Sequence, residues 1–217
     1  MTIADWYFDF VSPFSYLQCE RLPLLEPRLS VRCKPVVFGA ILAAHGHKGP
    51  AEIVAKRKFT YRMVIWQARQ LGIPFKFPPV HPFNPLPLLR LAVACDSRFD
   101  AVQRIFRFVW RDGRLPDLPI EWAELAHELG MPDAQARIVL PDVKDELRRN
   151  TDEAIARGVF GVPTLAFGGE LFWGADATDM ALDFLDAGCR LDDPEYARVD
   201  ALPVGVVRTA AKPARGG

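Results

Sequence analysis

The sequence has few cysteines, no net charge and no long apolar run. Its 27 basic and 27 acidic side chains cancel, so a broad electrostatic surface for nucleic acid or anionic lipid is not expected. No apolar run reaches the roughly 20 residues that a membrane-spanning helix needs. The N-terminal stretch MTIADWYFDF has no basic segment and gives no sign of a secretion signal. These absences predict an ordinary globular protein that binds neither nucleic acid nor a membrane.

The four cysteines are too scattered for a disulfide framework or a metal site. They stand at Cys19, Cys33, Cys95 and Cys189. None belongs to a Cys-x-x-Cys pair, and none lies near a histidine at metal-ligand spacing. We therefore expect reduced, mostly buried thiols, no metal, and a cytoplasmic location.

The first 40 residues predict a strand, a helix and a second strand. The apolar and aromatic stretch 2–10 fits a buried strand. It stops at Ser12-Pro13, the residue types preferred at the cap and first position of a helix. A second strand is expected at 31–38, so that the three elements form a right-handed β-α-β unit.

The middle of the chain predicts helices, and strands return only near the end. A helix is expected at 51–72, followed by a proline-rich loop at 73–85 and further helical patterns up to Gly158. Residues 162–174 predict a hairpin that turns at Gly168-Gly169, and a helix follows at 175–188. The order predicts an α/β protein: a thioredoxin-like domain (1–40 and 143–189), a helical insertion (41–142) and an irregular tail (190–217).

Three features together resemble the DsbA-like superfamily. Ser12-Pro13-Phe14-Ser15, within FDFVSPFSYL, stands at the corner where thioredoxin-like oxidoreductases carry Cys-x-x-Cys. Gly161-Val162-Pro163-Thr164 resembles the cis-proline loop that faces this corner, and the helical insertion separates the two. The stretches GPAEIVAKRKF, LGIPFKFPPVHPFNPLPLLR and GVFGVPTLAFGGELFWGADATDM are similar to the branch of 2-hydroxychromene-2-carboxylate isomerases and kappa-class glutathione transferases.

Ser12 is the catalytic candidate. A hydroxyl cannot form a mixed disulfide, so thiol-disulfide exchange is excluded at this corner. A helix N-terminus still suits an anion, and the resemblance implies that this anion is the thiolate of glutathione, to which Ser12 donates a hydrogen bond. The alternative is an ordinary helix cap, with the Ser12 oxygen turned to the amide of Ser15. No role is assigned to Ser15 itself.

The resemblance also implies a set of glutathione-binding residues. Val162 would pair with the ligand through its main chain, exposed by a cis bond to Pro163. Ala175 and Asp176 match the segment that holds the γ-glutamyl end, although the family often has serine where Ala175 stands. Lys56 matches a lysine that reaches the glycyl end. The alternatives are a trans proline, a helix-terminal acid and a solvated lysine.

The substrate pocket is predicted more loosely. An aromatic keto acid needs apolar walls and a polar anchor, for which we select Phe38, Trp66 and Phe83, with Asn84 as the anchor; core packing is the alternative for each aromatic. Where kappa-type relatives supply an asparagine, this chain has a loop with His45 and His47. Two histidines without a third ligand do not predict a metal site.

The resemblance implies a glutathione-dependent cis/trans isomerase of an unsaturated aromatic 2-oxo acid, acting by reversible thiolate addition. One alternative is a kappa-like glutathione transferase or peroxidase, and another is a non-catalytic DsbA-like binding protein. Relatives also suggest a homodimer.

Overall fold

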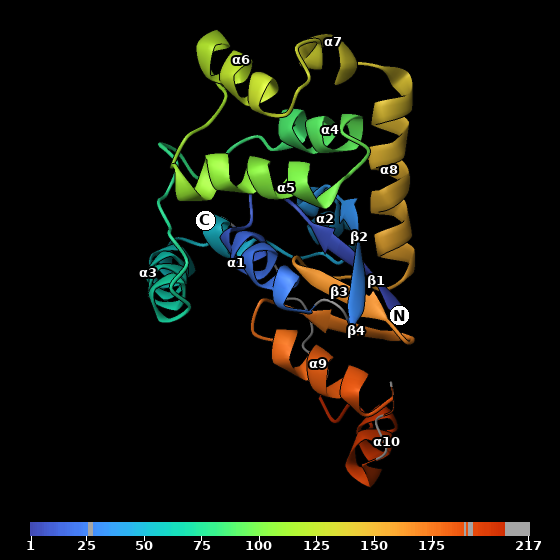
Figure 1. Cartoon of the computed structure of the whole chain (residues 1–217). Coiled ribbons are helices and arrows are strands. Elements are labelled where there is room, and N and C mark those ends of the chain that lie inside the picture. The colour runs from blue at the N-terminus through green and yellow to red at the C-terminus, as the bar shows by residue number, and fades with distance from the viewer. Residues whose placement is uncertain (26–27, 189, 191–192, 207–217) are drawn as a thin grey trace, which may run out of the picture.

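A computed structural model describes residues 1–25, 28–188, 190 and 193–206 of the chain. A mixed sheet of four strands lies at its centre, in the order β2-β1-β3-β4 (Figure 1). Strand β1 (Thr2–Phe8) runs parallel to β2 (Leu29–Pro35). Strand β3 (Thr164–Phe167) runs antiparallel to both β1 and β4 (Glu170–Trp173). The predicted α/β class, β-α-β unit and late hairpin are thus confirmed.

The side chains of strand β1 are buried on both faces of the sheet. Trp6 and Phe8 point into the larger core, where their rings stack with centroids 4.4 Å apart. Tyr7 points to the opposite face and joins a smaller cluster that includes Val162. This alternation follows from the two-residue period of a strand, and it explains why the stretch is apolar almost throughout.

The first turns after the sheet differ slightly from the prediction. Helix α1 (Pro13–Arg21) continues as a 3₁₀ turn, η1 (Leu22–Leu25), over Pro23. Phe38, which was expected to end the second strand, instead begins α2 (Phe38–Ala44). Its amide donates to the Asp9 carboxylate at 2.9 Å and the Val37 amide donates to Thr151 Oγ1 at 3.1 Å. Side chains therefore take the amides that a longer strand would have used.

The helical block is present as expected, with the proline-rich segment as an irregular connection. Figure 1 shows α4 to α7 stacked on one side of the sheet, with α3 and α8 far apart at its flanks. The elements are η2 (Pro50–Glu52), α3 (Val54–Gln70), α4 (Leu86–Ala94), α5 (Phe99–Phe106), the π-helical turn η3 (Arg107–Arg111), α6 (Pro119–Glu128), α7 (Ala134–Arg137) and α8 (Pro141–Ala156).

The C-terminal part carries one helix more than the sequence suggested. Helix α9 (Thr178–Asp186) follows the hairpin as expected. Within the tail expected to be irregular, α10 (Pro194–Asp200) forms, because Asp193 accepts a hydrogen bond from the Glu195 amide at 2.7 Å and Pro194 occupies the first helical position. The prediction for 207–217 lies outside the described residues.

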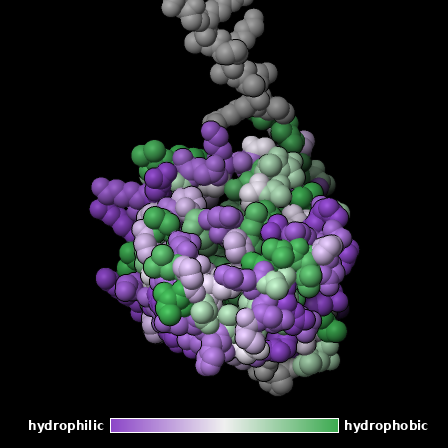
Figure 2. Space-filling view, turned by 90° about the horizontal axis from the view of Figure 1, so that it is seen from above, coloured by the Kyte–Doolittle hydropathy of each residue, from purple (hydrophilic) through white to green (hydrophobic). Residues whose placement is uncertain are grey.

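The surface and the thiols fit the composition. Hydrophilic and hydrophobic side chains are interspersed over the face seen in Figure 2. None of the helices in the described residues is long and apolar enough to cross a membrane. Cys19, Cys33 and Cys95 are buried free thiols, whereas Cys189 lies outside the described residues. The cytoplasmic location stays a prediction.

Candidate functional site

Ser12 caps helix α1 and faces the proline loop across a short gap. Its side chain is buried, with 7% exposure. The hydroxyl oxygen accepts a hydrogen bond from the Ser15 amide at 3.2 Å, and the only acceptor described for its proton is the Val162 carbonyl, 3.5 Å away. That distance is at the limit of a hydrogen bond. The oxygen is therefore oriented, while its proton can turn to a better acceptor at small cost.

The backbone that leads to Ser12 is held from three sides. The Phe10 carbonyl accepts from the indole of Trp110 at 2.8 Å, and the Val11 carbonyl lies 2.8 Å from His81 Nε2. The Ser12 amide donates to the Asp9 carbonyl at 3.0 Å. Since Trp110 and His81 come from the helical block, the insertion fixes the conformation of the corner.

Asp9 places a buried carboxyl group beside this corner. It is fully buried and accepts the amides of Val11 at 3.0 Å and Phe38 at 2.9 Å. Burial raises the pKa of Asp9 to about 7, although the two amide bonds act in the opposite direction. Asp9 thereby links the start of α2 to the turn that presents Ser12.

The proline loop has the predicted cis bond between Val162 and Pro163. The Val162 side chain is buried in the smaller core, and the Pro163 carbonyl accepts from the Gly174 amide at 2.8 Å. A side chain at position 161 would displace Trp173, because an added Cβ would lie 2.3 Å from Trp173 Nε1. The loop is thus fitted closely against the end of β4.

Ala175 and Asp176 lie beside α1, on the segment before α9. Gln18 of α1 donates to the Gly174 carbonyl at 3.1 Å and to Thr178 Oγ1 at 3.0 Å, while Arg21 donates to the Ala175 carbonyl at 3.3 Å. Ala175 is buried and Asp176 is exposed. Ser12 therefore faces Val162 at the start of α1, Gly174 is hydrogen-bonded to Pro163, and the Ala175 carbonyl is hydrogen-bonded to the last residue of α1.

The remaining predicted residues come from other elements of the chain. Phe38 packs against the smaller core, and Phe83 lies 6.3 Å in ring-centroid distance from both His81 and Trp110. Asn84 is exposed and accepts from the Leu86 amide at 3.1 Å, where it serves the start of α4. Lys56 and Trp66 are both exposed on α3, Trp66 by 60%. Their roles stay predictions.

Ser15 is a buried residue of α1, whereas His45 follows the end of α2. The Ser15 hydroxyl is fully buried and has no hydrogen-bond partner among the described residues. His45 Nε2 lies 3.0 Å from the Val159 carbonyl, so it must donate to that oxygen. His45 thus ties the loop after α2 to the segment that enters the proline loop.

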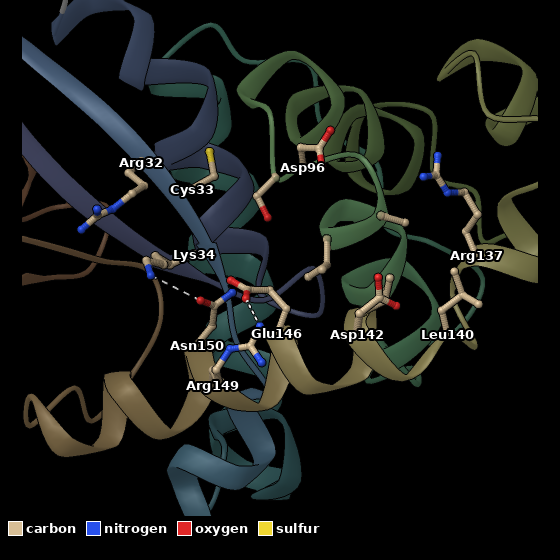
Figure 3. Close-up of a pocket in the computed structure, with 14 residues that line it drawn as sticks. Arg32, Cys33, Lys34, Asp96, Arg137, Leu140, Asp142, Glu146, Arg149 and Asn150 are labelled. Atoms are coloured by element: carbon tan, nitrogen blue, oxygen red, sulfur yellow. Dashed lines mark hydrogen bonds and ion pairs between the residues drawn. The ribbon is translucent and has the colours of Figure 1, made fainter.

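A separate cavity of about 500 Å³ lies at the exposed edge of β2 (Figure 3). Arg32, Lys34, Arg137 and Arg149 bring cations to it, and Asp96, Asp142 and Glu146 bring carboxylates. Three of these cations are engaged with carboxylates, in the pairs Arg32–Asp5, Lys34–Glu153 and Arg149–Glu146. None of the site residues predicted from the sequence lines this cavity.

Sequence reasoning missed Asp9, His81 and Tyr61. Asp9 stands in the same DF-x-SP-x-S stretch as Ser12, and a carboxylate inside an apolar strand was a usable signal. His81 lies between prolines in the loop from which only Phe83 and Asn84 were selected. Nothing local marks Tyr61, since its partner is twenty positions away. In the described residues no group of three potential ligands could hold a metal ion.

Comparisons with known proteins show the family and the fold of the chain. Residues 3–186 match the family model of the DSBA-like thioredoxin domain. The chain is 32% identical over 195 residues to 2-hydroxychromene-2-carboxylate isomerase of Pseudomonas putida, covering 87% of this chain and 96% of that protein. It is 26% identical over 205 residues to glutathione S-transferase kappa 2 of Caenorhabditis elegans, covering 84% and 91%. A solved structure of 2-hydroxychromene-2-carboxylate isomerase superposes with a TM-score of 0.76 at 27% identity, over 91% of this chain and 98% of the other.

Proposed function

We propose, because the chain belongs to the DSBA-like thioredoxin domain family and to its 2-hydroxychromene-2-carboxylate isomerase branch, that it is a glutathione-dependent isomerase. Its substrate would be an unsaturated aromatic 2-oxo acid. The isomerase activity itself is supported by three curated relatives of that name, which are 30% to 34% identical to this chain. The dependence on glutathione rests on the site.

Three residues from different elements would hold glutathione: Ser12 at the start of α1, Asp176 before α9 and Lys56 on α3. A thiolate would receive the Ser12 proton, which now meets only the distant Val162 carbonyl, at a helix end that carries partial positive charge. The exposed Asp176 carboxylate would pair with the ligand's ammonium group, and Lys56 with a carboxylate. When bound, glutathione would supply the thiolate that adds reversibly to the double bond of the substrate. The bond is then single and can rotate before elimination restores the double bond.

The chain's own contribution is orientation and charge stabilisation. The Ser15 amide turns the Ser12 oxygen so that its proton faces Val162. Because the oxygen is already held, only its proton has to turn when negative charge is present on a neighbouring atom. In the described part of the chain, no histidine bonds the Ser12 hydroxyl, so Ser12 lacks the base that a covalent nucleophile needs. The orientation of this hydroxyl is the observation that carries the proposal.

The test is to follow isomerisation of 2-hydroxychromene-2-carboxylate by the purified chain with three additions. These are reduced glutathione, S-methylglutathione and buffer alone. We expect enzyme-dependent turnover with reduced glutathione only, because the methylated peptide can fill the site but has no ionisable thiol. Full activity in buffer alone would contradict the proposed cofactor.

A kappa-like glutathione transferase or peroxidase is the second candidate, favoured by the match to the kappa enzyme. Conjugation of an electrophilic aryl halide, measured beside the isomerisation, separates the transferase from the isomerase. Both reactions need the same thiolate, so the two candidates differ only in which of the two reactions is catalysed. A third reading, a non-catalytic binding protein, predicts neither reaction. Absence of glutathione binding in calorimetry would favour this third reading.

We also propose that the chain forms a homodimer. Helix α3 exposes Val54, Phe59 and Trp66 by 60% or more each, and large exposed apolar groups on one helix are typical of interaction surfaces. Light scattering would give the mass of the particle. A monomer at micromolar concentration would contradict this proposal without affecting the catalytic one.

A further inference from the structure

His81 makes a hydrogen bond that fixes its own protonation. Its Nε2 lies 2.8 Å from the Val11 carbonyl oxygen. A carbonyl only accepts, so Nε2 must carry a hydrogen and donate it. Burial lowers the pKa of His81, and the nearby Arg57 guanidinium acts in the same direction. The ring is therefore neutral at pH 7, with its other nitrogen, Nδ1, free to accept.

Tyr61, on α3, completes the arrangement. Its hydroxyl oxygen lies 2.7 Å from His81 Nδ1 and 2.9 Å from the His81 carbonyl. A phenol has one proton to donate, and both Nδ1 of this tautomer and the carbonyl oxygen accept, so Tyr61 divides its proton between these two acceptors of His81. The Val11 carbonyl thus sets the tautomer, and Tyr61 holds the plane of the imidazole. Tyr61 and Arg57, both on α3, are the titratable groups that interact with His81.

The peptide unit between Val11 and Ser12 is consequently held at both ends. His81 donates to its carbonyl, and its amide donates to the Asp9 carbonyl at 3.0 Å. The Cα–Cβ bond of Ser12 starts from this unit. A rotation of the peptide plane would move the hydroxyl away from both the Ser15 amide and Val162.

We propose that His81 and Tyr61 form a positioning pair for Ser12, which connects α3 to the corner through the Val11 carbonyl. The proposal rests on the function proposed above, because it makes the orientation of the Ser12 hydroxyl depend on a residue from the helical block. If His81 acted only through the packing of its ring, replacement by phenylalanine would leave the corner unchanged. The rings of Phe77, Phe83 and Trp110 lie 5.4 to 6.3 Å from the imidazole, and a phenylalanine at position 81 would keep these contacts.

The decisive variants separate the hydrogen bond from the ring. His81→Phe keeps an aromatic ring but has no donor, whereas His81→Gln has no ring but can place an amide donor near the position of Nε2. We expect His81→Phe to lower kcat about tenfold, the equivalent of one hydrogen bond, with little change in KM for glutathione. We expect His81→Gln to recover most of the loss. Equal kcat values for His81→Phe and His81→Gln would overturn the proposal, and so would a higher kcat for His81→Phe than for His81→Gln.

A readout on the ligand-free chain makes the test independent of catalysis. Amide hydrogen exchange at Ser12 and Ser15 should become about tenfold faster in His81→Phe, while amides in the middle of α8 stay unchanged. If the wild-type chain shows no glutathione-dependent turnover but this exchange effect is present, the proposed function fails and the positioning pair stands. Unchanged exchange at both serines would overturn the pair whatever the activity.

Tyr61→Phe tests the second half of the pair with the loss of a single oxygen, should His81→Phe not fold. We expect about a threefold loss of kcat, because Nδ1 then loses its donor while Nε2 still reaches Val11. The matched controls are Tyr196→Phe on α10 and His127→Phe on α6, whose side chains are exposed. A loss in Tyr61→Phe no larger than in Tyr196→Phe would contradict the role of Tyr61.

Discussion

The corner at Ser12 and the cavity at the β2 edge differ in how their polar groups are satisfied. The cavity has a volume of about 500 Å³ and carries many charges, but three of its cations are engaged with carboxylates. The corner holds a hydroxyl with a nearly free proton and, within the part of the chain that the structure describes, a buried carboxyl group with no cationic partner and the unpaired hydroxyl of Ser15. Polar groups held in place but left without a strong partner mark a chemical site better than volume does.

The largest difference between the corner and the cavity should be in how the free energy of unfolding depends on pH. Burial raises the folded-state pKa of Asp9 from 3.8 to about 7, so folding takes up a proton between these values. The wild-type chain should therefore lose stability relative to Asp9→Asn as the pH rises from about 4 to 7, by on the order of 4 kcal/mol. Urea denaturation of both proteins across this range gives the difference curve.

The cavity provides the control for this prediction. Asp142→Asn changes an exposed carboxylate at the β2 edge, where water already solvates the charge. The same urea measurement on this variant gives the reference curve. Curves of equal slope would remove the contrast between the two regions.

The next effect in size concerns Ser12. Ser12→Ala should lower kcat about 100-fold, as removal of one oriented donor does elsewhere, and should cost about 1 kcal/mol of stability through the lost helix cap. Ser12→Thr retains a hydroxyl and serves as the matched variant. Steady-state kinetics decide, and wild-type turnover in the alanine variant would exclude the proposed role.

A smaller effect of opposite sign is expected at Ser15. Its hydroxyl is buried without a partner, which costs about 1 to 3 kcal/mol, and alanine is also the better helix former. Ser15→Ala should therefore raise the free energy of unfolding by about 1 kcal/mol, with turnover within about twofold of wild type. Thermal or urea unfolding measures it; a clear loss of stability would show that Ser15 has a partner after all.

The smallest effect is expected in the cavity. Arg149→Ala breaks the exposed pair with Glu146, and such pairs contribute about 0 to 1 kcal/mol. We expect a stability change below about 0.5 kcal/mol and unchanged isomerisation. A tenfold loss of activity would mean that the cavity, rather than the corner, contains the site.

Much of the fold could be predicted because its signals are local. The Ser12-Pro13 helix start, the aromatic strand before it and the Gly168-Gly169 turn each depend on neighbouring residues. The start of α2 at Phe38 could not be predicted, because it depends on Asp9 and Thr151, far away in sequence. The same holds for the site. The cis bond at Val162 followed from a motif, whereas the bonds of His81 and Trp110 to the corner span 70 and 100 positions.

The central claim is that the Ser12 hydroxyl stabilises a glutathione thiolate, and the pKa of the bound thiol tests it most directly. Ultraviolet absorbance of the thiolate, titrated with pH in the complex, should show ionisation well below the usual range of a thiol near 8.5 in the wild-type chain. In Ser12→Ala the titration should move at least about one pH unit back toward that value. The same titration in both proteins would contradict the account.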